Sequence, residues 1–389
     1  MDMQVSAARE PESTGPRPLD ELDRSVVQAL QIHPRAPWTL VGEVLGVNPV
    51  TAARRWQRLE RAGLAWVTAY GRLSDPRIVV TGVVEIDTDP GYGEEVADAL
   101  GIHPEVVNVK LTAGGRDLVA TIQAGGLEAL AHFTNELFRA TPGVRATRTH
   151  VATAVPTEGS RWRLRSLDAT QRARLERALP RTVPTRDTRD TRDTRDARDT
   201  RDTRDTRDAP GGGGAHGPGT HIRDELDTRL AELLGTDGRM SVPDLAKATG
   251  AGFTTVRRRL QTLLSSWLWL RCDLARPLSG WPLSAVYFAS VPAQHLDETV
   301  RLLSSVPEVR SCSITAGPHN VVLDVWLRTL ADVHTFEAHL AQRLPRLIVD
   351  DRSVVLRTTK HMGRLLDRDG ACVGVVPLPH YADAPPRTP

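Results

Sequence analysis

Two stretches of this chain, residues 50–61 and 254–266, carry arginines at helical spacing and almost no acid. Glu60 is the single acidic side chain of the first stretch, and the second stretch has none. Each stretch opens with small or hydroxyl side chains before its arginines begin. Guanidinium groups bind phosphates, and the first turn of such a helix can reach base edges in a major groove. The pattern therefore favours double-stranded DNA as the partner.

The first of these helices also has a recognisable start, because Asn48 is a good N-cap and Pro49 suits the first helical turn. A solvated helix in an ordinary three-helix bundle would also show arginines, but their occurrence in two such helices favours DNA binding. The residues that we expect to contact DNA are Asn48, Val50, Thr51, Arg54, Arg55 and Arg58 in the first stretch, and Thr254, Thr255, Arg257, Arg258 and Arg259 in the second.

A second pair of segments could bind a small ligand. Residues 112–117 read Thr-Ala-Gly-Gly-Arg-Asp, and residues 315–320 read Thr-Ala-Gly-Pro-His-Asn. Glycine at this place is typical of a hairpin turn, because it adopts positive φ without strain. The alternative is a ligand pocket in which the Asp117 carboxylate holds an α-amino group. The candidate effector-binding residues are Thr112, Gly114 and Asp117 in the first segment, and Thr315, Gly317 and Asn320 in the second.

These matching segments belong to a repeat that covers most of the chain. Asp20-Glu21-Leu22-Asp23 returns as Asp224-Glu225-Leu226-Asp227, an offset of 204, and after one deletion the similarity resumes at an offset of 203. A long-period repeat indicates two copies of one structural unit. The chain therefore carries both halves of an intramolecular pseudo-dimer, and the sequence leaves open whether two chains form a further homo-oligomer.

The front of each copy predicts a winged helix-turn-helix. Asp20 caps a first helix, in which apolar residues at helical spacing continue to about Gln31. A short helix over residues 40–45 ends at Gly46, a third helix spans residues 50–62, and residues 64–69 read as a strand suited to a wing. Copy two repeats this order, with helices predicted over residues 245–250 and 254–265.

The back of each copy predicts a β-α-β-β-α-β unit. In copy one the expected strands are 79–86, 106–112, 118–123 and 144–151, and the expected helices are 92–100 and 127–138. Copy two repeats the order from residue 285 to residue 356. The order implies a ferredoxin-like sandwich whose helices cover one sheet face and leave the other open, and a second copy would supply the covering sheet. The fold class is therefore α+β, with two winged helix-turn-helix domains and two ferredoxin-like sandwich domains.

This order of elements resembles the leucine-responsive/asparagine-regulator (Lrp/AsnC) transcription factors. The resemblance is carried by Leu19-Asp20-x-x-Asp23, by Arg54-Arg55-x-x-x-Leu59-Glu60-x-x-Gly63-Leu64, and by Thr112-x-Gly114-x-x-Asp117. It implies sequence-specific DNA binding, dimerisation through the sandwich, and a small effector, often an amino acid, bound between sandwich domains. Copy two departs from the pattern, since Asn320 replaces the acid, so the first copy is the better effector candidate.

Composition narrows the other possibilities. The 389 residues are 40% hydrophobic and 25% charged, as in soluble globular proteins with more than one core, and no apolar run suggests a membrane span. The three cysteines lie far apart and have no metal-ligand spacing, which indicates a reduced, cytoplasmic setting. We expect no cofactor and no metal. The net charge of +2 is small, so any attraction to DNA comes from local clusters.

The copies are separated by eight arginine-aspartate triplets over residues 185–208, whose charges cancel and which hold no apolar residue to form a core, so we expect a disordered linker. The chain is accordingly divided into a disordered N-terminus (1–18), a first winged helix-turn-helix (19–70), a first sandwich (76–158), a linker (159–221), a second winged helix-turn-helix (222–272), a second sandwich (280–360) and a C-terminal tail (361–389).

Two other functional classes fit the same architecture. Some haem-pathway decarboxylases resemble it, but they would need histidines and arginines gathered around a large tetrapyrrole cleft, and the twelve histidines here are scattered. No recognised catalytic motif occurs, so we expect no enzyme and no catalytic residues. An effector-binding scaffold that has lost DNA binding is the third class. For a regulator, we expect the two recognition helices to enter successive major grooves about 34 Å apart.

Overall fold

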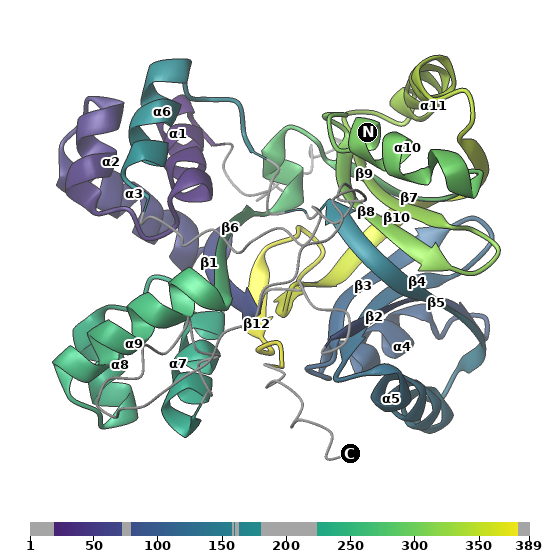
Figure 1. Ribbon diagram of the computed structural model, residues 1–389, viewed down its shortest axis with the longest axis horizontal. Coiled ribbons are helices and arrows are strands. Elements are labelled where there is room, and N and C mark those ends of the chain that lie inside the picture. The colour runs from purple at the N-terminus through teal and green to yellow at the C-terminus, as the bar shows by residue number, and fades with distance from the viewer. Residues whose placement is uncertain (1–18, 72–78, 158, 160–162, 180–223, 380–389) are drawn as a thin grey trace, which may run out of the picture.

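The computed structural model describes residues 19–71, 79–157, 159, 163–179 and 224–379. Two helical heads lie to one side, and a body of strands with helices on its outer surfaces lies to the other (Figure 1). The Thr-Arg-Asp triplets and residues 1–18 are outside the described residues, so their disorder stays a prediction. Of the helices that the structure describes, none is long and apolar enough to cross a membrane.

Each head contains three helices, in the order that the sequence predicts. They are α1 (Glu21–Ile32), α2 (Trp38–Leu45) and α3 (Pro49–Arg61) in the first head, and α7 (Glu225–Thr236), α8 (Val242–Thr249) and α9 (Phe253–Ser266) in the second. Asp20 and Asp23 form a capping box at the start of α1, and Gly46 ends α2 in the left-handed conformation. Local capping signals therefore set these boundaries.

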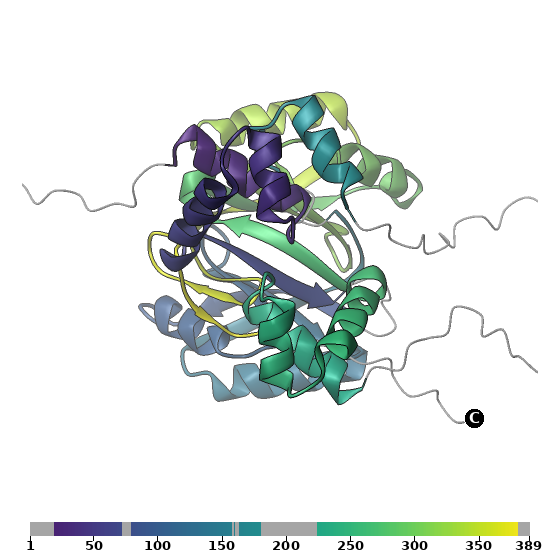
Figure 2. The ribbon, with the colours of Figure 1, turned by 90° about the vertical axis from the view of Figure 1, so that its left-hand side faces the viewer.

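The strand that follows each head does not fold back within that head as a predicted wing would. Strands β1 (Ala65–Gly71) and β6 (Leu268–Leu274) pair with each other as a two-stranded antiparallel ribbon. The ribbon crosses between the heads in the view of Figure 2. Cys272 and Leu274 are buried in the core of the first head, and Ala69 is buried in the core of the second. The two heads thus complete each other's cores.

Part of the predicted linker belongs to the first head. Helix α6 (Ala169–Arg177) begins with a capping box between Asp168 and Gln171. Leu175 on this helix is fully buried in the core of the first head. The segment that leads into α6 is held by Gln28, whose Oε1 accepts a hydrogen bond from the backbone N–H of Leu167 at 2.7 Å. The linker prediction for 159–221 is therefore wrong over residues 163–179.

The body contains the two expected β-α-β-β-α-β units. Copy one supplies β2 (Val80–Thr88), α4 (Gly93–Gly101), β3 (Val106–Ala113), β4 (Leu118–Ala124), α5 (Leu127–Ala140) and β5 (Val144–Thr157). Copy two supplies β7 (Leu283–Ser290), α10 (Leu296–Leu303), β8 (Val309–Ala316), β9 (Val321–Leu327), α11 (Asp332–Arg343) and β10 (Ile348–His361), with short 3-10 turns at Arg276–Ser279 and Ala293–His295. Within each copy the helices pack on one sheet face, and the other face meets the partner copy.

The two sheets also join at both edges, which no local sequence pattern predicts. β5 pairs with β8 and β10 pairs with β3, all antiparallel, and the pairs Val151↔Ala316 and Val354↔Ala113 are related by the repeat offset of 203. Because β10 also pairs with β7, the eight strands of the two units form a closed barrel. Pairing both edges leaves no strand edge of either four-stranded sheet exposed to further pairing.

Residues of the predicted C-terminal tail form a hairpin between the heads and the barrel. Strands β11 (Arg364–Leu366) and β12 (Cys372–Val375) follow directly from β10. The backbone N–H of Cys372 donates to the carbonyl of Gly63 in the first head at 2.8 Å. Figure 1 shows this hairpin in yellow beside the head ribbon. The prediction of a tail over 361–389 is therefore corrected for residues 361–379, which connect the barrel to the heads.

Candidate nucleic-acid interface and effector site

The first turn of α3 presents the side chains predicted to read DNA. The side chain of Asn48 accepts a hydrogen bond from the backbone N–H of Val50 at 2.8 Å, so its oxygen caps the helix. Val50 is 56% exposed, and Thr51 is also exposed. An apolar side chain and a hydroxyl are therefore available at this helix start for contact with base edges.

The second recognition helix begins differently. Its N-cap, Gly252, offers no side-chain hydrogen bond, and the first helical residue, Phe253, is 48% exposed. Thr254 is exposed, whereas Thr255 is only partly exposed. The corresponding first turns of α3 and α9 therefore differ in shape as well as in sequence.

Three of the predicted DNA-binding arginines, Arg55, Arg58 and Arg259, have carboxylate partners inside their own heads. Arg55 and Arg58 form ion pairs with the N-terminal acids of α1, and Arg259 reaches the buried Asp227 of α7 at 3.0 Å. These guanidinium groups join the recognition helix to the first helix of its head.

Arg54, Arg257 and Arg258 are exposed, and among the residues that the structure describes they have no carboxylate within ion-pair distance. Arg54 lines a shallow surface groove together with Thr51, Arg55 and Arg58. At the offset of 204, Arg54 and Arg258 occupy corresponding positions of the two heads. Each head therefore has an exposed arginine without an internal carboxylate partner at this position.

The acid of the predicted effector turn has a structural role. The Asp117 carboxylate accepts hydrogen bonds from the backbone N–H of Thr88 at 2.7 Å and from its hydroxyl at 3.1 Å. In copy two, Asn320 accepts from the backbone N–H of Val291 at 2.9 Å and donates to its carbonyl at 2.7 Å. The change from acid to amide therefore keeps the bond that joins the turn to the end of the first strand.

The threonine of each turn also makes the same bond in both copies. The Thr112 hydroxyl donates to the carbonyl of Arg116 at 2.9 Å, and the Thr315 hydroxyl donates to the carbonyl of His319 at 2.6 Å. These bonds close the turn within each copy. The structure thus brings the predicted effector residues together as two equivalent turns, one in each copy.

The glycines of the turns allow the copies to approach each other closely. Gly114 has a φ of +135°, and a Cβ added there would lie 3.1 Å from the carbonyl oxygen of Arg352. A Cβ at Gly317 would lie 3.2 Å from Nδ1 of His150. Contacts this short show that each turn sits against the last strand of the other copy.

A charged cluster that no sequence motif indicates lies where these turns meet. Arg116 is 6% exposed, and its Nε lies 2.6 Å from Glu85, whose other oxygen is 2.6 Å from Nε2 of His150. Arg116 also pairs with Asp351 of copy two, and its guanidinium stacks 4.3 Å from the Phe288 ring centroid. Burial alone would raise the pKa of Glu85, but His150 and Arg116 outweigh it, and the pKa lies below its usual value.

The residues of this cluster differ from their counterparts in the other copy. At the offset of 203, Glu85 corresponds to Phe288, Arg116 to His319, and His150 to Ser353. His150 of copy one lies 5.5 Å from Phe288 and 6.1 Å from His319 of copy two between ring centroids, so side chains of the two copies meet in this cluster. The available signal is Glu85, a charged residue between Val84 and Ile86 whose counterpart in copy two is aromatic.

Within the described residues, no group of three or more His, Cys, Asp or Glu side chains is placed to hold a metal ion. The family model of the AsnC-type helix-turn-helix domain matches residues 19–60 and 224–264. The model of the Lrp/AsnC ligand binding domain matches residues 81–162. The front of both copies and the back of copy one are therefore recognised independently of the fold.

Curated relatives match over about one copy. The chain is 28% identical over 137 residues to the HTH-type transcriptional regulator FL11 of Pyrococcus horikoshii, covering 34% of this chain and 89% of that protein. It is 26% identical over 151 residues to the HTH-type transcriptional regulator AldR of Mycolicibacterium smegmatis, covering 37% of this chain and 87% of that protein.

Among solved structures, the siroheme decarboxylase NirDL in complex with an iron-uroporphyrin III analogue has a TM-score of 0.51. The match covers 88% of this chain and 93% of that chain at 12% identity, so it concerns the fold alone. The sequence matches place two AsnC-type helix-turn-helix domains and one Lrp/AsnC ligand binding domain in this chain.

Proposed function

We propose that this protein is a transcriptional regulator that binds a single DNA site with both of its heads, and that a small effector modulates it. The observation that carries the proposal is the pair Arg54 and Arg258, which occupy corresponding, exposed positions on α3 and α9. A helix of this kind places its first turn in the major groove, and basic residues one turn later meet phosphates.

The internal ion pairs support this division of roles. Arg55 forms ion pairs with Asp20 and Asp23, and Arg259 forms ion pairs with Asp224 and Asp227, so the same ion pairs recur in both heads. These ion pairs hold the recognition helix against the first helix of its head, and the preceding arginine, Arg54 or Arg258, is exposed. We propose that Arg54, Arg257 and Arg258 bind phosphates, while Val50, Thr51 and Thr254 meet base edges.

The ribbon between the heads supports binding to one site. β1 and β6 pair over seven residues and complete each other's head cores, which connects the two heads that carry the recognition helices. The two heads then present α3 and α9 to successive major grooves of one duplex, whose spacing is about 34 Å. The effector would act at the junction of the sandwich copies, where the turns of residues 112–117 and 315–320 meet the opposite strands.

The test is the salt dependence of DNA binding, measured by fluorescence anisotropy on a site selected from random DNA. Replacing Arg54 or Arg258 by alanine should reduce the slope of log affinity against log salt by about 0.9 for each lost phosphate contact. Arg139→Ala is the matched control, because Arg139 lies on α5 with an exposed side chain and only a local pair to Glu136. Unchanged salt slopes for both the Arg54→Ala and the Arg258→Ala variant would contradict the assignment of α3 and α9 as recognition helices.

The whole-chain fold likeness to a siroheme decarboxylase motivates one further measurement. The absorption spectrum of the purified protein, alone and with added iron-uroporphyrin, reports any bound tetrapyrrole. A regulator gives no tetrapyrrole spectrum and retains DNA binding. Tetrapyrrole binding together with loss of a carboxyl group as CO₂ would favour the enzyme instead.

A further inference from the structure

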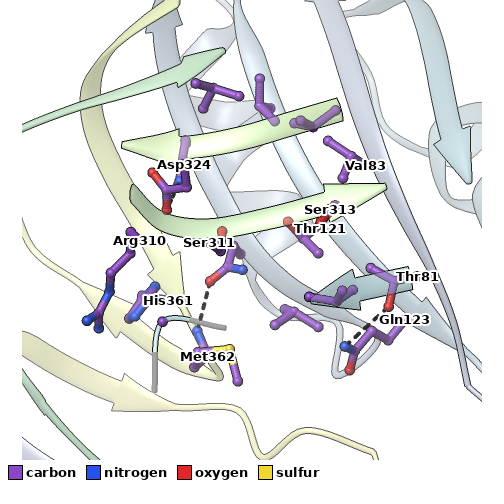
Figure 3. A pocket seen from close by; sticks show the side chains of 18 of the residues that line it. Thr81, Val83, Thr121, Gln123, Arg310, Ser311, Ser313, Asp324, His361 and Met362 are labelled. Carbon is purple, nitrogen blue, oxygen red and sulfur yellow. Dashed lines mark hydrogen bonds and ion pairs between the residues drawn. The ribbon is translucent and has the colours of Figure 1, made fainter. Parts of the chain in front are cut away.

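A cavity lies between the two sheets at the end of the barrel that faces the heads. Its volume is about 120 Å³, and its lining includes Tyr70 of β1 and Arg271 of β6, so its mouth adjoins the head ribbon. Figure 3 shows side chains of both copies around it, among them Thr121 and Ser313. This cavity is separate from the turns of residues 112–117 and 315–320, none of whose effector candidates lines it.

Part of the cavity lining differs between the copies. Lys110 of β3 forms a 2.7 Å ion pair with Asp324 of β9, joining copy one to copy two. At the offset of 203, the counterparts of these two residues are Ser313 and Thr121. A hydroxyl pair therefore stands where the pseudo-symmetric ion pair would be, and a serine side chain is much shorter than a lysine side chain. All four of these residues line the cavity.

The lining has an apolar side and a polar side. The valines of the barrel interior, Val83, Val119, Val286 and Val322, form a hydrophobic cluster against which an aliphatic group can pack. The hydroxyls of Thr121 and Ser313 are on the polar side, with the ammonium of Lys110 nearby. An ammonium has three N–H donors, and the bond to Asp324 uses one of them.

Positive charge predominates on the described part of the lining. Lys110, Arg271 and Arg310 are cationic, and Asp324 is the single carboxylate among the described lining residues. Asp273, which does not line the cavity, forms ion pairs with Arg271 at 2.6 Å and with Arg310 at 3.0 Å, so the three cations exceed these two carboxylates by one charge. Burial, and then Arg271 beside it, lowers the pKa of Arg310 to about 9. This excess of one positive charge would attract an anion in the cavity.

We propose that this cavity binds a small aliphatic carboxylate of about six non-hydrogen atoms. Its carboxylate would accept hydrogen bonds from Thr121, Ser313 and Lys110, and its hydrocarbon part would pack on the barrel valines. The size follows from the volume, since a protein cavity of roughly 150 Å³ holds a molecule of the size of benzene. Drug-sized ligands occupy roughly 300–1,000 Å³, so this site takes a smaller molecule.

The cavity wall is connected to the heads. Met362 lines the cavity and is the single non-glycine residue with a positive φ, +47°, in the part of the chain that the structure describes. Its backbone N–H donates to Oδ1 of Asn108, another lining residue, at 3.1 Å. Strained backbone of this kind persists where its surroundings hold it. Because Met362 begins the turn into the hairpin that contacts the heads, a ligand beside it can influence them; this regulatory consequence rests on the proposed function.

Isothermal titration calorimetry on the full chain with 2-methylpropanoate tests the binding itself. This anion has a branched aliphatic group and six non-hydrogen atoms. The matched probe is 2-methylpropanamide, which has the same shape without charge and should bind at least tenfold more weakly. Inorganic phosphate, an anion with no apolar part, should not compete at equal concentration. Equal binding of the amide, effective competition by phosphate, or no binding of the carboxylate at millimolar concentration would each overturn the proposal.

Two variants locate the site. Ser313→Leu fills the cavity and should abolish binding, and Thr121→Val removes a hydroxyl at nearly constant shape and should weaken binding about tenfold, as expected for one bond to a charged group. Thr147→Val makes the same change on an exposed part of β5 and should leave binding unchanged. Thermal unfolding and DNA binding of each variant check that it is folded. Retained carboxylate binding in a folded Ser313→Leu protein would place the ligand elsewhere.

DNA binding is measured separately, on the protein without carboxylate. If the protein binds DNA but not 2-methylpropanoate, only the cavity proposal is contradicted. If it binds the carboxylate in a Ser313-dependent way but does not bind DNA, only the regulator proposal is contradicted. The two failures are therefore distinguishable.

Discussion

Arg35 of the first head and Arg239 of the second head bind each other's backbone reciprocally. Arg35 donates to the carbonyls of Gly238 and Met240 at 2.7 and 2.8 Å, and Arg239 donates to those of Pro34 and Ala36 at 2.5 and 3.0 Å. The two arginines correspond at the repeat offset of 204. Each therefore satisfies carbonyls of the turn after the first helix in the opposite head, and together they fix the heads relative to each other.

Replacing either arginine by alanine should loosen the heads. Each change removes two hydrogen bonds from a charged donor and leaves carbonyls without partners, which costs about 2–3 kcal/mol of unfolding free energy. Arg239→Ala should cost somewhat more, because this guanidinium also stacks 4.3 Å from the Trp38 ring centroid. Urea denaturation measures both effects. The control Arg139→Ala, at an exposed site, should stay within about 0.5 kcal/mol of the parent, and equal stability of all three variants would contradict this account.

The unequal first turns of α3 and α9 predict a non-palindromic DNA site. Val50 and Thr51 face outward at the start of α3, whereas Phe253 and Thr254 do so at the start of α9. Thr254→Val, which copies the side chain of Val50, should change the preferred bases in one half-site only, by about 1–3 kcal/mol per discriminated base pair. Selection of bound sequences from random DNA measures this. A palindromic consensus that Thr254→Val leaves unchanged would argue against separate reading by the two heads.

The bonds of Asp117 separate its structural role from an effector role. Asp117→Asn should keep the unfolding free energy within about 0.5 kcal/mol of the parent, because Asn320 makes the corresponding bond in copy two, whereas Asp117→Ala should lose about 1–2 kcal/mol. Denaturation compares the two. If the carboxylate instead holds an α-amino group, Asp117→Asn will abolish the response of DNA binding to amino acids while stability stays unchanged.

Local signals in the sequence account for the parts of the fold that can be predicted well. Caps at Asp20, Asn48 and Gly46 act on neighbouring residues, so they place the head helices to within a few residues. The partner of β1 lies about two hundred residues away, and no local pattern distinguishes a wing strand from one half of a ribbon between heads. The same reason applies to the edge pairs that close the barrel.

The roles of the candidate DNA-binding arginines also depend on partners that are distant in the sequence. Arg54 and Arg55 are adjacent in the sequence and equally basic, yet only Arg55 meets the acids of α1, because a helix turns neighbouring residues to different faces. The repeat holds a usable signal, since Asp20, Asp23 and Arg55 all recur at an offset of 204. The helix α6 also has one, because Asp168 and Gln171 are spaced as a capping box.

Stability should fall as the pH falls from 7 towards 5. Burial lowers the pKa of His33, and burial also lowers the pKa of His361, which faces Asp273, Arg271 and Arg310. Each ring therefore takes up its proton at a lower pH in the folded protein than in the unfolded chain, where histidine is protonated below about pH 6.5. Stability is therefore fully present above that pH and decreases below it, by at most about 1.4 kcal/mol per pH unit for each histidine.

Chemical denaturation at a series of pH values measures this slope. The variant His33→Gln removes the contribution of one ring, so its profile between pH 7 and pH 5 should be flatter than that of the parent. His132→Gln is the control, because His132 is exposed on α5. A parent profile that is flat across this range, or one that His33→Gln and His132→Gln alter equally, would exclude buried neutral histidine as the cause.

Arg364 should couple ligand binding in the barrel cavity to DNA binding by the heads. Its side chain is buried, and Nη2 donates to the carbonyls of Gly235 and Thr236 at the end of α7 at 2.9 and 2.8 Å. It stands two residues after Met362 in the cavity wall, so a ligand-induced shift of the turn would reach α7 through it.

Arg364→Gln should therefore leave 2-methylpropanoate binding unchanged and reduce the effect of that ligand on DNA affinity at least severalfold. Titrations of DNA with and without the ligand measure the coupling, which is reciprocal at equilibrium. If full coupling persists in a folded Arg364→Gln protein, the connection between barrel and heads runs through the β1–β6 ribbon instead.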